Sequence, residues 1–416
     1  MRTDGMASSP RLQSGILAAA LVLFGSPLST PAADSVDSLT LDAAFARLLS
    51  ANPTIVAERL RRAVDLVGVS VARERLNPEA RVEFERETPK QAYSLALPLE
   101  IGRKRGRRIA VSEAALHTGE AQVDQAIVEI RAQVRQAYFG RVIAEARLQV
   151  LAELQEFAVR ARDAAQQRFD AGSAPRLEVL QAQLALAQAE NEEDVARAGA
   201  HAAAVQLNVL LGYPLDAQIT LATTLDGSET PDVGVAISRA QTANAELALL
   251  DRQIEEARAR IALARSLRVP NVTPEATLTR DAAPEFDTGW RAAVGMTLPL
   301  LTTHKAGVRV EEAALLQLQA ERDATLARIT GEVSSAAALA DAQRQAYLRY
   351  HDHILPQAVE VASMAEDSYR LGRTGIAAFL QALQASRDAR LQSLLAASGY
   401  QDALADLERV MGTPIQ

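Results

Sequence analysis

The feature that most constrains how this chain folds is an internal duplication. The segment YSLALPLEIGRKRGRRIAVSEAAL (93–116) is echoed by RAAVGMTLPLLTTHKAGVRVEEAAL (291–315), and QRFDAGSAPRLEVLQAQLAL (167–186) by DSYRLGRTGIAAFLQALQAS (367–386). Pro98 and Pro299 are 201 residues apart, and Gly172 and Gly372 are 200 apart. Because constant spacing over several elements does not arise by chance, the sequence indicates a tandem repeat of one structural unit.

Both halves show the same order of patterns: a helix, two short strands, a long helical stretch, a turn and a second long helix. The predicted ranges are, in turn, 40–75, 80–87 with 92–100, 105–169, a turn near 170–175 and 175–211, and then 233–267, 275–281 with 289–300, 304–370, a turn near 371–376 and 376–411. We therefore expect a first repeat at 34–214, a Thr-, Asp-, Gly- and Pro-containing linker at 215–232, and a second repeat at 233–416.

The long helical stretches carry apolar residues at coiled-coil spacing. Ile127, Ile130, Val134 and Ala137 are separated by three and four residues, and Leu326 to Ala340 repeat this pattern. Alternating small and larger residues at such positions allow helices to pack closely. The predicted fold class is mostly α with a small β part, built from duplicated long-helix hairpins.

The predicted strands are apolar on one face and polar or small on the other. In 289–298, one face carries Trp290, Val294 and Met296, and the other carries Arg291 and Gly295. This alternation is typical of strands in an outer-membrane barrel, and equally of a half-buried sheet in a soluble protein. Four strands are too few to close a barrel, and open edges are not tolerated in lipid, so a membrane barrel would need several copies of the chain.

The N-terminus has the pattern of an export signal. Arg2 and Arg11 precede an apolar run at 15–24, and small residues follow up to Ala33, which predicts a signal peptide at 1–33. The absence of cysteine excludes disulfides and thiolate metal sites. The net charge of −8 argues against general nucleic-acid binding.

The sequence contains no catalytic motif that we can identify, and it predicts neither an enzyme nor a cofactor or metal site. His351 and His353 flank Asp352, but residues two apart on an α-helix do not share a face, so we interpret this HDH sequence as a surface feature unless Pro356 breaks the helix.

The duplicated order of motifs resembles the TolC family of outer-membrane efflux channels, from LTLDAAFARLLSANPTIVAERL (39–60) to LNVLLGYP (207–214) and its repeat LERVMGTP (407–414). The segment LALPLEIGRKRGRRIAVSEA (95–114) is similar to the heavy-metal (Czc/Cus-type) branch, although Ile101 to Arg105 depart from that branch's G-G-K-R stretch.

This resemblance implies a homotrimer in which four transmembrane strands per protomer close a twelve-stranded barrel in outer-membrane lipid, while the helices form a periplasmic barrel. It implies a passive exit duct for heavy-metal cations, with a periplasmic adaptor (a membrane fusion protein) and an inner-membrane RND pump as partners. The alternatives are a duct for drugs or other organic compounds, a type I secretion duct, or, in another class, a soluble periplasmic coiled-coil scaffold.

A basic cluster follows the second predicted strand and consists of Arg103, Lys104, Arg105, Arg107 and Arg108. Under the resemblance, it lies where the barrel meets the tunnel. We expect it either to anchor the membrane rim against anionic headgroups or to pair with acidic residues of a neighbouring helix; a solvated charged face is the alternative.

The resemblance also assigns the two turns to the periplasmic tips of the hairpins, where an adaptor would dock. The tip residues are Gly172, Ser173, Gly372 and Thr374. Just past the first tip, Glu178 is the candidate acid of a constricted aperture; Ala378 takes its place in the second half. A first-turn acid stabilised by the helix dipole is the alternative for Glu178.

Overall fold

The computed structural model describes residues 38–222, 229–282 and 286–415. The predicted signal peptide (1–33) and part of the predicted linker (223–228) lie outside these residues. The described residues belong to one compact unit, which begins at Ser38.

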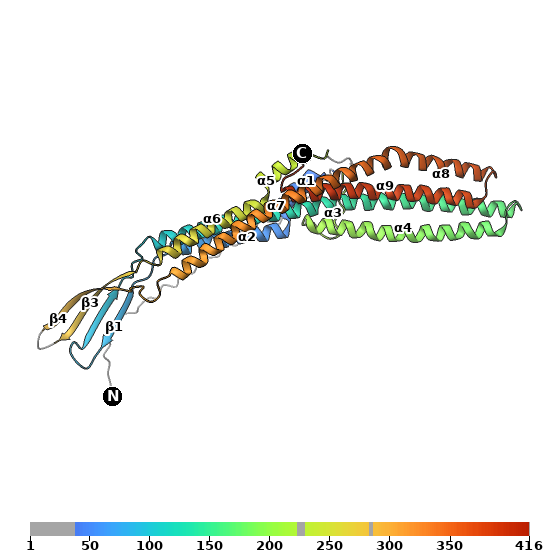
Figure 1. The fold of residues 1–416 in the computed structure, drawn as a ribbon. Coiled ribbons are helices and arrows are strands. Elements are labelled where there is room, and N and C mark those ends of the chain that lie inside the picture. The colour runs from blue at the N-terminus through green and yellow to red at the C-terminus, as the bar shows by residue number, and fades with distance from the viewer. Residues whose placement is uncertain (1–37, 223–228, 283–285, 416) are drawn as a thin grey trace, which may run out of the picture. The chain divides into compact units, whose positions relative to one another are not determined.

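The elements follow one another in two parallel series (Figure 1). The first series is α1 (Leu41–Ala51), α2 (Pro53–Arg73), β1 (Glu79–Phe84), β2 (Gln91–Ala96), α3 (Lys104–Asp170) and α4 (Arg176–Leu210). The second is α5 (Val233–Ala243), α6 (Ala245–Ser266), β3 (Val272–Ala282), β4 (Phe286–Met296), α7 (Lys305–Arg349), the π-helix η1 (Tyr350–Ile354), α8 (Leu355–Arg370) and α9 (Ile376–Met411).

The first helix of each series is broken at an asparagine, so the prediction of single helices at 40–75 and 233–267 is wrong. The Asn52 side chain accepts hydrogen bonds from the backbone of Thr54 and Ile55 and starts α2. Asn244 starts α6 in the same way. The two side-chain amides also donate to the carbonyls of Leu210 (2.7 Å) and Val410 (2.8 Å). Each break is therefore fixed to the end of a long helix.

The two long helical stretches differ. The first is the single helix α3, as expected, whereas the second is interrupted by η1 between α7 and α8. The helical stretch predicted at 304–370 is present from Lys305 to Arg370, and its residues 350–354 form a π-helical turn that was not predicted from the sequence. Each repeat has its own buried core. In the first repeat, α1, α3 and α4 pack around Leu48, Val134 and Leu207; in the second, α5, α7 and α9 pack around Val333 and Leu404.

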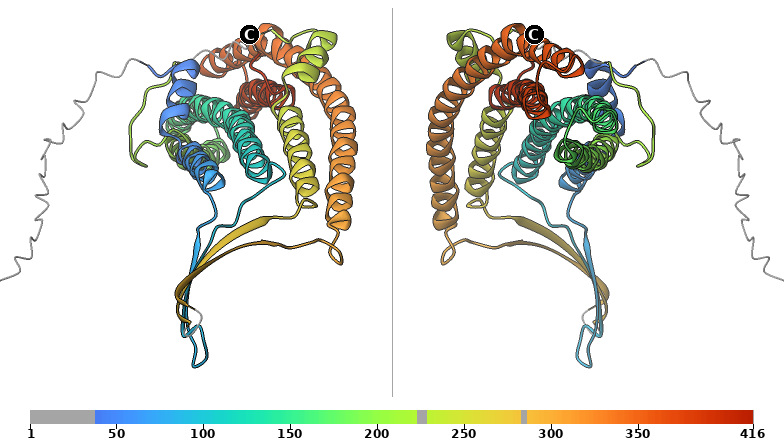
Figure 2. Two further views of the ribbon diagram at one scale, coloured as in Figure 1. Left: turned by 90° about the vertical axis from the view of Figure 1, so that its left-hand side faces the viewer. Right: turned by 90° about the vertical axis from the view of Figure 1, so that its right-hand side faces the viewer.

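Sheet and helices share one spatial order. The strands form an antiparallel sheet in the order β1-β2-β3-β4. Next to it α2, α3, α6 and α7 lie side by side in that order, as Figure 2 shows. We call the sheet together with the row of helices α2-α3-α6-α7 the wall of the protomer. Because α2 leads into β1 and α7 follows β4, one end of the wall is formed by β1 and α2 and the other by β4 and α7.

Candidate functional site

The sheet has one apolar and one polar face, set by its register. Val82, Tyr93, Leu278 and Trp290 are paired in one row across all four strands. These side chains are exposed, and Trp290 retains 83% of its accessible surface. A contiguous row of exposed large apolar residues is typical of a surface that lipid or protein covers.

The opposite face carries the row Arg81, Ser94, Thr277 and Arg291. Thr277 is only 4% exposed, and its hydroxyl group lies 3.1 Å from that of Ser94. The sheet therefore separates an apolar side from a side with polar and small residues. Among the described strands, β1 and β4 each pair on one edge only.

The basic cluster lies where the sheet meets the helices, and its members have different environments. Lys104 is buried and donates to the side chain of Asn271 at 2.5 Å. Arg105 donates to the carbonyl of Arg73 through Nε (2.9 Å) and Nη2 (2.6 Å). A cation at the last carbonyls of a helix complements the helix dipole, so Arg105 stabilises the end of α2.

Arg108 joins the same helix end to the strand segment. It donates to the carbonyls of Ala72 (3.2 Å) and Glu74 (2.9 Å) and forms an ion pair with Glu100 at 2.6 Å. The acidic partner thus precedes α3 in the chain instead of lying on a neighbouring helix. Arg103 and Arg107 are exposed. Anchoring to headgroups remains a prediction for these two residues. The alternative of a solvated charged face does not apply to Lys104, because its side chain is buried.

At the two hairpin tips, α3 and α8 end in the same kind of turn. Gly172 and Gly372 have φ of 71° and 68°. The amides of Ser173 and Arg373 donate back five residues, to the carbonyls of Arg168 and Ser368. This is the Schellman arrangement that a glycine with positive φ allows at a helix C-terminus. The hydroxyl oxygen of Thr374 is buried with no partner among the described residues.

Glu178 contacts the second hairpin. It accepts a hydrogen bond of 3.3 Å from the hydroxyl group of Tyr369. Tyr369 is 1% exposed and stacks on Phe379 at 5.5 Å between ring centroids, and the guanidinium of Arg168 lies over its ring at 4.8 Å. Burial raises the pKa of the Tyr369 hydroxyl, and the negative charge of Glu178 raises it further. Tyr369 and Arg168 were missed in the sequence, because only the fold brings them to Glu178.

The HDH sequence falls in η1. His351 and His353 are exposed, and Nδ1 of His351 lies 2.8 Å from the carboxylate of Asp352. Within residues 38–222, 229–282 and 286–415, no group of three or more His, Asp or Glu side chains is placed to hold a metal ion.

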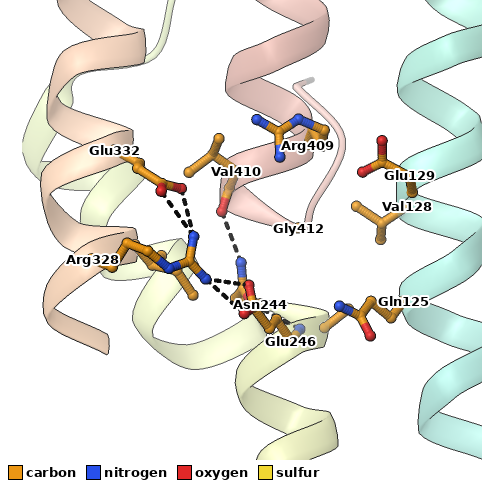
Figure 3. Close-up of a pocket in the computed structure, with 12 residues that line it drawn as sticks. Gln125, Val128, Glu129, Asn244, Glu246, Arg328, Glu332, Arg409, Val410 and Gly412 are labelled. Atoms are coloured by element: carbon orange, nitrogen blue, oxygen red, sulfur yellow. Dashed lines mark hydrogen bonds and ion pairs between the residues drawn. The ribbon is translucent and has the colours of Figure 1, made fainter. Parts of the chain in front are cut away.

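A polar pocket of about 90 Å³ marks the point where α3, α6, α7 and α9 meet (Figure 3). Arg328 on α7 forms ion pairs with Glu246 (2.6 Å) and Glu332 (2.9 Å). Asn244 donates to Val410, and Gln125 of α3 faces this corner from the other side. The ion pairs and the helix cap at this pocket all lie within the second repeat, and the first repeat lines the pocket through Gln125, Val128 and Glu129 of α3.

In the part of the chain that the structure describes, none of the helices has the length and apolar character needed to cross a membrane.

Solved structures with this arrangement are outer-membrane channels. The Campylobacter jejuni CmeC outer membrane channel matches with a TM-score of 0.75 at 15% identity, over 89% of this chain and 85% of that one. CusC, solved in a study of its folding and transmembrane channel formation, matches with a TM-score of 0.74 at 14% identity, over 91% and 93%. The predicted fold class is confirmed: the chain is mostly helical with a small antiparallel sheet, and it shares this fold with these channels.

The sequence matches the outer membrane efflux protein family over residues 45–213 and again over 236–413. The chain therefore belongs to this family of channels, and the two matched ranges follow the duplication. It is also 23% identical, over 91% of both chains, to the cobalt-zinc-cadmium resistance protein CzcC of Cupriavidus metallidurans. The resemblance stated from the sequence is confirmed. The protein is an outer-membrane efflux channel whose helical part lies in the periplasm.

Proposed function

We propose that three copies of this chain form the passive exit duct of a tripartite efflux system for heavy-metal cations. The observation that carries the proposal is the open-edged sheet: an apolar face suited to lipid, with one unpaired edge on β1 and another on β4. Because open edges are costly in a bilayer, the edges of adjacent copies pair, and three copies supply twelve strands.

The metal cargo is supported by the relationship to a cobalt-zinc-cadmium resistance protein. A channel does not need a tight metal site, because tight binding would slow passage. In this proposal an RND pump selects and drives the cation, and a periplasmic adaptor couples that pump to the tips around Gly172, Ser173, Gly372 and Thr374. Glu178 supplies one carboxylate per protomer near the entrance.

We further propose that residues 1–33 direct export and are removed, and that 34–214 and 233–416 act as the two repeats on either side of a linker at 215–232. Arg103 and Arg107, the exposed members of the basic cluster, would face the headgroups at the membrane rim.

The experiment is a growth and accumulation assay in a strain that lacks the gene. We expect loss of the protein to raise cellular cobalt, zinc or cadmium and to lower tolerance of that metal, with restoration by the wild-type chain. Unchanged metal tolerance together with sensitivity to organic toxicants would transfer the proposal to drugs, and loss of a secreted polypeptide would transfer it to type I secretion.

A matched pair of variants tests the membrane role of the sheet. Val294→Arg places a charge on the apolar face, and Ala293→Arg places the same charge on the polar face. A lipid-facing arginine near the bilayer midplane costs about 2–4 kcal/mol. We expect only Val294→Arg to lose outer-membrane insertion. Equal insertion of both variants would show that Val294 does not face lipid, and recovery of both variants and of the wild-type chain in the soluble periplasmic fraction would support a soluble scaffold instead.

A further inference from the structure

Helix α2 has two apolar faces, and the chain itself covers only one of them. Ile55, Val69 and Ala72 are buried within the protomer. On the other side Val56, Leu60, Val64, Val67 and Val71 are exposed, with Val64 retaining 70% of its accessible surface. Their spacing of four, four, three and four residues places them on one stripe. Such a contiguous exposed apolar stripe is typical of a protein interface.

Helix α7 carries an exposed stripe of mostly small residues on the face opposite its buried side. The buried side includes Val308, Thr325 and Ile329. The exposed stripe consists of Ala306, Val310, Ala313, Gln317, Ala320 and Ala324. These residues alternate at four and three positions, which is the spacing of a helix–helix seam. A bulky stripe and a stripe of small residues are complementary in shape.

The two stripes lie on the open ends of the wall. The order α2-α3-α6-α7 leaves α2 at one end and α7 at the other, beside the unpaired edges of β1 and β4 (Figure 2). A second copy that pairs its β1 with this copy's β4 also brings its α2 next to this copy's α7. The helix stripes are thus continuous with the sheet edges.

The chain contains an internal template for this contact. In the interface between α3 and α6, the hydroxyl group of Thr118 donates to the carboxylate of Glu256 at 2.8 Å, in a buried setting. The duplication relates α3 to α7 with a spacing of 199, as for Glu113 and Glu312, which both pair with an arginine. It relates α2 to α6 with a spacing of 192, as for Asn52 and Asn244.

Applying these two spacings converts the pair Thr118 and Glu256 into Gln317 and Val64. Gln317 lies at the centre of the α7 stripe, and Val64 at the centre of the α2 stripe. The stripes were identified from exposure alone, whereas the template comes from a contact elsewhere in the chain. Their agreement assigns the register as well as the faces.

We infer that the α2 stripe packs into the α7 stripe of a second copy of this chain, with Val64 opposite Gln317, as Glu256 lies opposite Thr118 within one chain. This inference rests on the proposed assembly of several copies. At this position the seam between copies places one polar residue, Gln317, opposite the apolar Val64, whereas the seam within the chain holds a buried polar pair.

The absence of native cysteine permits a direct test. The double variant Val64→Cys with Gln317→Cys, produced in the outer membrane and oxidised, is expected to yield crosslinked dimers and trimers on a denaturing gel. Each single variant should yield neither. The matched control is Leu66→Cys with Gln317→Cys, because Leu66 is also an exposed apolar residue of α2 but lies off the stripe.

The size of the same protein extracted in detergent distinguishes a failure of the inferred α2–α7 contact from a failure of the proposed assembly of three copies. Three chains by size, with crosslinks from the Val64 pair and not from the Leu66 pair, is the expected result. Three chains by size without crosslinks from the Val64 pair, or with stronger crosslinks from the Leu66 pair, would overturn the inference and leave the proposed assembly in place. A single chain by size would overturn the proposed assembly itself.

Discussion

The two hairpins follow one plan but differ at one turn of helix. In the first, α3 runs unbroken for 67 residues; in the second, η1 interrupts the equivalent stretch over five residues. Ile130 and Ile329 are 199 residues apart, whereas Phe169 and Tyr369 are 200 apart. A π-turn holds one more residue than an α-turn, so η1 absorbs one additional residue. As a result, α7 before the extra residue and α8 after it present to their neighbours the faces that correspond to those of α3.

The largest expected effect comes from deletion of one residue in α3, compared with a matched deletion in the second hairpin. Deleting Gln149 from α3 rotates everything beyond it by about 100°, because an α-helix has 3.6 residues per turn. This removes contacts such as the ion pair between Glu153 and Arg390 at 2.7 Å. We expect loss of the heat-resistant assembly, measured by gel mobility without boiling.

The matched deletion is that of Asp352 from η1. It should convert the π-turn into an α-turn and leave the faces in register, so the assembly should survive with a small change in its melting temperature. Equal damage from the two deletions would show that η1 does more than absorb one residue.

The next comparison concerns a buried ion pair that joins the two halves and has no counterpart at the repeat-equivalent positions. Arg135 of α3 and Glu408 of α9 are each 4% exposed and lie 3.1 Å apart. The repeat-equivalent positions hold Ser334 and Asn208, which cannot form this pair. Breaking a buried ion pair costs about 3–5 kcal/mol.

We therefore expect Glu408→Gln to lower the free energy of unfolding by about that amount, measured by denaturant titration of the detergent-solubilised protein. Ser334→Ala is the control and should have almost no effect. A negligible loss in Glu408→Gln would mean that the two repeats are held together at this level by apolar packing alone.

Gly212, which lies against the end of α1, should tolerate a side chain less well than Gly172 at the first tip. Gly212 has φ of 64°, and an added Cβ would overlap the carbonyl oxygen of Ala51, whereas an added Cβ at Gly172 would meet nothing within 4 Å. Left-handed backbone costs a residue with a side chain about 1–2 kcal/mol. Thermal melts should show that cost for Gly172→Ala and a clearly larger one for Gly212→Ala. The reverse order would contradict the close approach of Gly212 to Ala51.

The smallest expected effect is at the tip. Tyr369→Phe removes the hydrogen bond to Glu178, which is worth about 1 kcal/mol. We expect faster hydrogen exchange confined to residues near 170–180 and 365–380, without a global change in stability. Tyr213→Phe is the control, because the ring of Tyr213 contacts Arg47 at 3.5 Å and the substitution preserves that ring.

Much of this fold could be predicted from the sequence because it is periodic and stated twice. The duplication, the long helices and the faces of the strands all depend on local spacing, and the structure has them. The break at Asn52 also had a local signal, since Asn followed by Pro53 is a typical helix start. The change from 199 to 200 in the repeat spacing was the signal for η1.

The residues around the site were predictable only in part. The basic cluster is visible in the sequence, but the burial of Lys104 and the bonds of Arg108 to the end of α2 depend on where that helix stops beside α3. Glu178 could be identified, but its partner Tyr369 is 191 positions away in sequence. Contacts at such separation follow from the packing of the two hairpins, which no local pattern specifies.

The most direct test of the account is the mass of the protein extracted in mild detergent from an outer-membrane fraction, determined by light scattering. The account predicts three chains per particle, which fall apart to single chains only on strong heating. A single chain in the soluble periplasmic fraction would contradict it.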